Sequence, residues 1–138
     1  MKIELNKVNE AVHFEAISPS TEVKVHIDGS PDIGGEGLGA RPMELVLMAV
    51  GSCSALDLVN ILKKQRQDIQ DLKIEVEGTR VDTIPKVFTA IHIHFKFKGN
   101  IDADKAAKAA ELAVKKYCSV HDMLAAGGVD ITYEITIN

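Results

Sequence analysis

The sequence predicts an α+β fold in which strands and helices are grouped in blocks along the chain. Several segments alternate apolar and polar residues with a period of two, which is typical of strands with one buried face. Two other segments are long and either apolar or alanine-rich, with the start and stop signals of helices. The predicted order is β-β-β-α-β-β-α-α-β, and strands in blocks favour α+β over a doubly wound parallel sheet. The 138 residues fit a single domain, residues 1–138.

The N-terminal part of the chain predicts three short strands. Turn-forming residues separate them at Asn9-Glu10 and at Ser18-Pro19-Ser20. One polar and one apolar face is typical of an antiparallel sheet that helices cover on a single side. The apolar positions are Ile3 and Leu5 in the first strand, Val12, Phe14 and Ala16 in the second, and Val23, Val25 and Ile27 in the third.

A long helix is predicted from about Pro42 to Asp68. Proline suits the first helical position, and Glu44 complements the positive end of the helix dipole. Apolar residues cover nearly the whole circumference, so protein should surround this helix, and we expect part of its surface to meet a second subunit. The stretch approaches membrane-spanning length, but Glu44, Asp57 and Asn60 are costly in lipid, which favours a buried helix of a soluble protein.

Three further strands are predicted in the second half of the chain. Asp82-Thr83-Ile84-Pro85 supplies a turn between the first two of them. Their alternating apolar positions are Leu72, Ile74 and Val76, then Ile91, Ile93, Phe95 and Phe97, and finally Ile131, Tyr133, Ile135 and Ile137.

Two helices are predicted between the last two of these strands. The first has Asp102 or Asp104 as its N-cap and continues to Cys118. The second is short, with Ser119 in a capping box at its start and Gly127-Gly128 at its end.

Charge and cysteine content exclude several classes of function. A formal net charge of -4 argues against a protein that binds nucleic acid through its phosphates. No continuous apolar segment follows Met1 as it would in a secretory signal peptide. Two cysteines are too few for a secreted disulfide scaffold or a four-cysteine zinc site. We therefore expect a cytoplasmic protein without nucleic acid or membrane partners.

A glycine-rich loop precedes the long helix. Gly35-x-Gly37-x-x-Ala40 matches a dinucleotide-binding pattern, but that fingerprint requires a following parallel strand, whereas here a helix follows. The pattern therefore favours a mobile loop that leads into the helix.

Histidines on the predicted strands raise the question of a metal site. His92 and His94 leave the same strand face and could bind a metal, and a crossed site between His13 and His26 is conceivable. The face is the polar one and the sequence fixes no third ligand nearby, so surface histidines without a metal are the preferred interpretation.

The two cysteines are the strongest candidates for chemistry. Cys53 lies within the long helix among small residues, and Cys118 lies at the end of the second helix. If the two thiols meet at facing helices, one can attack a peroxide O–O bond and the other can condense with the resulting sulfenic acid. The alternative is a pair of structural buried cysteines, since free cysteine packs as a small hydrophobic residue.

With these motifs the chain resembles the OsmC/Ohr family of thiol peroxidases, the organic hydroperoxide resistance and osmotically inducible proteins, and particularly its YhfA-like branch. The resemblance covers nearly the whole chain and depends most on residues 41–57 and 116–120. It implies antiparallel sheets packed on two long central helices in an intertwined homodimer. It also implies that Cys53 is the peroxidatic thiol and Cys118 the resolving thiol, with organic hydroperoxides as substrates, an external dithiol as reductant, and no cofactor or metal.

The start of the long helix departs from the family pattern. Peroxidase members carry an acidic residue directly after the proline, and this residue helps to position an arginine that stabilises the thiolate. This chain has Met43 at that place and Glu44 one position later, and no arginine precedes Arg41. Arg41 could substitute for the missing cation, and His121, which follows Cys118 closely, is the candidate replacement base.

Together with the two cysteines, the resemblance implies a thiol-dependent peroxidase that reduces organic hydroperoxides through a Cys53/Cys118 redox pair in a largely apolar pocket at the dimer interface. Two alternatives stay open. One is a non-enzymatic dimeric protein that binds a small hydrophobic ligand, which Met43 and the missing arginine favour. The other is a thiol redox sensor.

Overall fold

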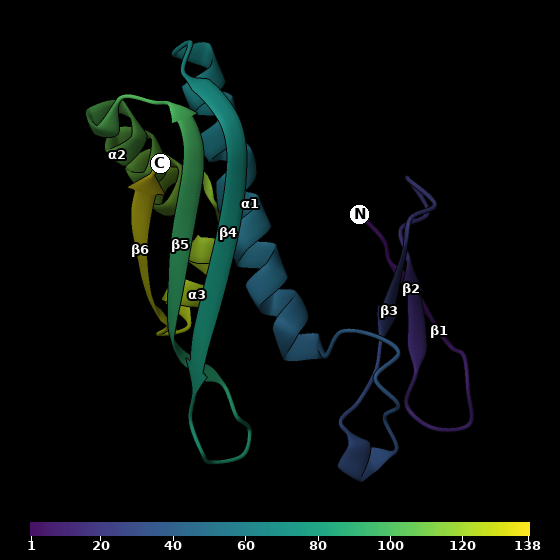
Figure 1. The fold of residues 1–138 in the computed structure, drawn as a ribbon. Coiled ribbons are helices and arrows are strands. Elements are labelled where there is room, and N and C mark those ends of the chain that lie inside the picture. Colours follow the sequence, from purple (N-terminus) through teal and green to yellow (C-terminus); the bar gives the residue numbers. More distant parts are fainter. The chain divides into compact units, whose positions relative to one another are not determined.

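The computed structural model describes residues Met1–Asn138 and confirms the predicted α+β class and element order (Figure 1). The chain contains two three-stranded sheets and three α-helices. It forms two compact units, Met1–Val46 and Leu47–Asn138.

The first unit contains an antiparallel sheet in the order β1 (Glu4–Lys7), β2 (Phe14–Ile17) and β3 (Lys24–Ile27). Both turns lie where the sequence predicts them. No apolar side chain of this unit is buried, because three short strands have no layer packed on their apolar face within the unit. The large apolar side chains exposed on and around the strands are Ile3, Leu5, Val8, Val23 and Val25.

The glycine-rich loop after β3 is organised by a buried carboxylate. The Asp28 side chain is 2% exposed and accepts hydrogen bonds from the backbone N–H groups of Gly29, Glu36 and Leu38, at 2.8, 2.9 and 3.1 Å. These bonds, above all those from Glu36 and Leu38, hold the pKa of Asp28 below its usual value. The loop, which includes the 3₁₀ turn η1 (Pro31–Ile33), is therefore tied together rather than free as the sequence suggested.

Helix α1 (Pro42–Lys64) begins at the predicted proline but ends before the expected Asp68. Arg66 adopts a positive φ of 57°, its N–H donates to the Lys63 carbonyl, and the N–H of Gln67 donates to the Leu62 carbonyl. This is the Schellman pattern that closes many helices. This helix end is not predictable from the residue types, because glycine, not arginine, usually occupies the left-handed position.

One face of α1 is buried and the other is not. Val50, Ser54, Leu58 and Leu62 are fully buried, whereas Met48 and Leu56 are 53% and 75% exposed. By length and composition alone α1 could cross a membrane, and 28% of its apolar window is buried within the chain. The same length and composition occur in core helices of soluble proteins, so the helix alone is weak evidence for a membrane span.

The second unit is built on a mixed sheet in the order β4-β5-β6. Strands β4 (Asp68–Arg80) and β5 (Phe88–Asn100) form an antiparallel hairpin, but β6 (Asp130–Ile137) pairs with β5 in parallel. The expectation of purely antiparallel sheets is wrong here, because the helical crossover after β5 returns the chain to the same end of the sheet. The helices cover one face of this sheet (Figure 1). The predicted apolar row of β5 is buried against them, namely Ile91, Ile93, Phe95 and Phe97.

The crossover consists of α2 (Ala103–Glu111), the π-helix η2 (Leu112–Tyr117) and α3 (Ser119–Ala126). Asp102 is the N-cap of α2, and its side chain accepts from the backbone N–H of Lys105. The helix does not continue to Cys118 as predicted, because the π-helix widens its last turns and Cys118 adopts an extended conformation. Cys118 rather than Ser119 is therefore the N-cap of α3.

Candidate active site

Cys53 is a half-buried residue in the middle of α1. A neighbouring glycine brings this part of the helix close to β4. A Cβ atom placed on Gly51 would lie 2.7 Å from Val76 Cγ2, which is closer than ordinary packing allows. The small residues around Cys53 thus fix how closely the helix approaches the sheet.

Cys118 is held at the junction between the π-helix and α3, and it is 1% exposed. Its Sγ accepts a hydrogen bond from the backbone N–H of His121 at 3.3 Å, as a serine at an N-cap would. Its thiol also donates a weak hydrogen bond of 3.9 Å to the Val50 carbonyl of α1. The sulfur is therefore fixed between α3 and α1.

The two thiols, far apart in the sequence, are neighbours in the structure, and both are free. Burial raises the pKa of the Cys118 thiol, and the neighbouring Cys53 acts in the same direction. The hydrogen bond from the His121 N–H and the nearby Ser54 hydroxyl oppose this rise without cancelling it. Two adjacent thiols on separate elements are the arrangement that a reversible disulfide requires.

The predicted supporting residues are placed differently. His121 serves Cys118 through its backbone N–H, and its ring Nδ1 lies 3.1 Å from Asp122 Oδ1 instead of facing the sulfur. Arg41 and Glu44 belong to the first unit, where both are exposed and neither forms a salt bridge. The structure thus brings together Cys53, Cys118 and the backbone of His121.

Sequence reasoning missed Ser54 as a part of this site. Ser54 is fully buried, its Oγ donates to the Val50 carbonyl at 2.9 Å, and the Cys118 sulfur bonds the same carbonyl at 3.9 Å. The only sequence feature that could have indicated this role is its position directly after Cys53. A serine within a helix commonly bonds the carbonyl one turn back, so its presence there does not indicate a functional site.

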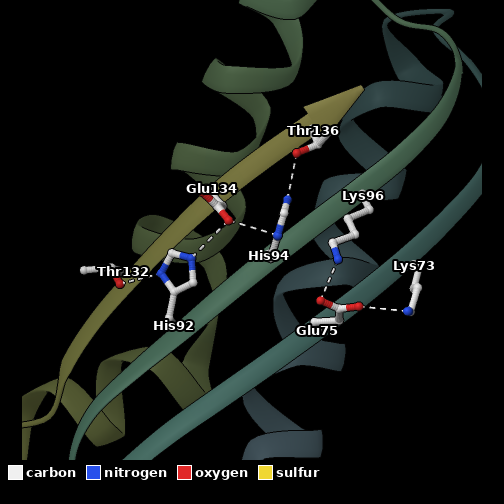
Figure 2. A network of polar contacts seen from close by, with 8 residues as sticks. All are labelled: Lys73, Glu75, His92, His94, Lys96, Thr132, Glu134 and Thr136. Atoms are coloured by element: carbon white, nitrogen blue, oxygen red, sulfur yellow. Dashed lines mark hydrogen bonds and ion pairs between the residues drawn. The ribbon is translucent and has the colours of Figure 1, made fainter. Parts of the chain in front are cut away.

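The outer face of the second sheet carries the predicted polar row. His94 Nδ1 and His92 Nε2 lie 2.9 and 3.6 Å from Glu134 Oε1, and their other ring nitrogens bond the hydroxyls of Thr136 and Thr132 (Figure 2). No set of three or more His, Cys, Asp or Glu side chains is arranged to hold a metal ion. His92 and His94 thus lie on the polar face of the sheet, each held between Glu134 and a threonine of β6.

A second polar group on this face surrounds Glu75. Lys73 and Lys96 lie 2.8 and 2.6 Å from its two carboxylate oxygens and lower the pKa of Glu75 to about 2 (Figure 2). In the first unit, His13 and His26 do meet, with 2.9 Å between Nε2 and Nδ1, but without a third ligand.

An apolar groove of about 490 Å³ lies between α2 and β6 in the second unit. Neither cysteine lines it. Its lining residues are Ala103, Ala107, Tyr133, Ile135 and Ile137.

Comparisons with known proteins agree with this fold. The family described as OsmC-like protein matches residues 34–134. Protein YhfA of Escherichia coli (strain K12) is 44% identical over 97 residues, which cover 70% of this chain and 72% of YhfA. The crystal structure of a hypothetical protein from Aquifex aeolicus VF5 is 32% identical with a TM-score of 0.81, over 99% of this chain and 96% of that one.

A more distant structural neighbour carries a functional name. It is an organic hydroperoxide resistance protein OsmC from Legionella pneumophila, which superposes with a TM-score of 0.71 over 98% of this chain and 95% of that one. At 16% identity this likeness shows a shared fold. The match over residues 34–134, together with the 44% identity to YhfA, shows that the chain belongs to the OsmC-like protein family.

Proposed function

We propose that the protein is a thiol-dependent peroxidase that reduces organic hydroperoxides through Cys53 and Cys118. The observation that supports the proposal is the position of the two free thiols: the Cys118 sulfur is held by the first turn of α3 and bonds the Val50 carbonyl of α1, less than one helical turn from Cys53. Family membership supports the substrate class, since the Legionella pneumophila neighbour is named for organic hydroperoxide resistance.

The proposed cycle has three balanced steps. The Cys53 thiolate attacks the O–O bond, forms a sulfenic acid and releases an alkoxide, which takes up the proton lost by Cys53 and leaves as the alcohol. The Cys118 thiolate then attacks the sulfenic sulfur, forms the disulfide and expels hydroxide, which leaves as water with the Cys118 proton. An external dithiol reduces the disulfide by two exchanges and is itself oxidised to a disulfide. Such a cycle suits a reducing cytoplasm, where we place the protein.

A homodimer is part of the proposal. Met48, Ser52 and Leu56 form an exposed row at four-residue spacing on α1, and the first unit leaves its apolar strand residues uncovered. Both surfaces need a covering layer, which a second copy of the chain supplies.

Titration of the reduced protein with cumene hydroperoxide tests the proposal. Both thiols of each chain should be lost, and Cys53→Ser should abolish the loss. Cys118→Ser should lose its one thiol as a sulfenic acid that dimedone traps. Continuous turnover with excess dithiothreitol supports an enzyme, whereas one disulfide without turnover supports a redox sensor instead. Thiols that react no faster than free cysteine would contradict both.

A hydrophobic-ligand-binding protein is the second candidate, and the groove between α2 and β6 favours it. In that case the thiols survive the peroxide titration, and a fluorescent fatty acid binds saturably to the protein whether or not the cysteines are replaced by serine.

A further inference from the structure

We infer that Ser54 is a positioning residue for Cys118, whose hydroxyl turns from the Val50 carbonyl to the Cys118 sulfur when that sulfur loses its proton. The inference deepens the proposed function, because it assigns a donor to the thiolate that would close the disulfide.

One carbonyl oxygen brings the two side chains together. The Val50 oxygen accepts from Ser54 Oγ at 2.9 Å and from Cys118 Sγ at 3.9 Å. Ser54 and Cys118 are 0% and 1% exposed, so bulk water does not supply hydrogen bonds to either group. The shared oxygen therefore places the serine hydroxyl and the cysteine sulfur against the same atom of α1.

The hydroxyl has a single proton, so it can serve only one acceptor at a time. While Cys118 is a thiol, its own S–H and the serine O–H both point to the Val50 oxygen. Once Cys118 is a thiolate, it needs donors, and His121 N–H supplies one of them. Rotation of the serine O–H supplies the second, while the Val50 oxygen keeps the backbone bond that every helical carbonyl makes.

This exchange matters because burial disfavours the charged form of Cys118. A buried thiolate with a single donor is costly, and a second charge-assisted hydrogen bond lowers that cost. Ser54 keeps its own proton throughout. Its effect is on the fraction of Cys118 that is ionised and ready to attack the Cys53 sulfenic acid.

The test measures the Cys118 pKa directly, by thiolate absorbance near 240 nm in the Cys53→Ser background, where no peroxide chemistry takes place. Ser54→Ala should raise this pKa by about one pH unit, the effect of one lost charge-assisted hydrogen bond. Ser54→Thr, which retains a hydroxyl, should return the value toward that of the parent. Ser52→Ala is the matched control, because the exposed Ser52 hydroxyl bonds the Met48 carbonyl at 2.7 Å in the same way and does not touch the sulfur.

With Cys53 restored, Ser54→Ala should also move the pH profile of disulfide formation to higher pH, by the same amount. Equal Cys118 pKa values in Ser54→Ala and Ser52→Ala would overturn the assignment, whatever the peroxide titration shows. If Ser54→Ala raises the Cys118 pKa but the protein does not react with peroxide, the role of Ser54 is supported and only the proposed peroxidase function is contradicted.

Discussion

At the scale of single residues, Asp28 is the one charged side chain of the chain that is buried. It has no basic partner in a salt bridge and depends on three backbone N–H donors. Between the ends of the loop, backbone bonds are confined to the segment around η1, and Glu36 and Leu38 lie beyond it, so the carboxylate supplies the acceptor for their N–H groups. The conformation of the loop therefore depends on the negative charge of Asp28.

Asp28→Asn should lower the melting temperature by an amount on the order of 5 °C at neutral pH, because an amide nitrogen replaces one of the accepting oxygens. The folded-state pKa of Asp28 lies below its usual 3.8, so its contribution is present above about pH 4 and is lost as pH falls through the folded pKa. The difference between wild type and variant should accordingly shrink in acid.

Thermal melts followed by circular dichroism at several pH values measure this difference. Asp82→Asn is the control, since Asp82 is an exposed acid in the β4–β5 turn without a hydrogen-bond partner. An equal loss in the two variants, or a difference that grows in acid, would contradict the role given to Asp28.

Residues of the site were predictable only in part. The sequence itself singles out Cys53 and Cys118 as candidates, the family resemblance adds their separate roles, and the structure places the Cys118 sulfur against α1, the helix that carries Cys53. The role of His121 differs from the prediction because the start of α3 directs its backbone N–H, not its ring, toward the sulfur. Ser54 was missed because no spacing rule links a helical serine to a thiol on another element.

At the scale of elements, period-two alternation predicted every strand, and the buried apolar row of β5 matches it residue by residue. Alternation indicates which face of a strand is buried but not the direction in which the strand runs. The parallel pairing of β6 with β5 therefore could not be predicted from it. The π-helix at residues 112–117 could not be predicted either, because its residues are equally compatible with an α-helix.

The contact between α1 and β4 gives a prediction for this scale. The higher helix propensity of alanine in Gly51→Ala should add about 1 kcal/mol to the free energy of unfolding. The clash of the new methyl group with Val76 should lower that free energy by a similar or larger amount. Val76→Ala removes the clashing methyl group and should rescue the variant. Urea unfolding of the two single variants and the double variant at one protein concentration should give a favourable coupling on the order of 1 kcal/mol. Strictly additive values would mean that the helix does not rely on glycine to approach the strand.

At the scale of the whole molecule, the single chain leaves a large apolar surface uncovered, which the proposed homodimer would cover. Burial reaches 28% of the apolar window of α1, and the first unit buries no apolar side chain. A helix that is apolar on every side is stable in water when protein covers its remaining face. The row of Met48, Ser52 and Leu56 has the spacing of a ridge that packs against another helix, with a small residue at its centre.

If two copies meet along this row, Leu56→Lys should weaken the dimer at least tenfold, because a two-fold axis brings the introduced charge close to its copy and an apolar contact is lost. Sedimentation velocity over a range of protein concentrations measures this effect, with wild type expected at twice the 15.0 kDa mass of the chain. Ile84→Lys is the matched control, since Ile84 lies in the β4–β5 turn and is 93% exposed. A monomeric wild type would contradict the proposed dimer. Equal dissociation of both variants would show that this row is not part of the interface, because a charge on the row would then weaken assembly no more than the same charge in a solvent-exposed turn.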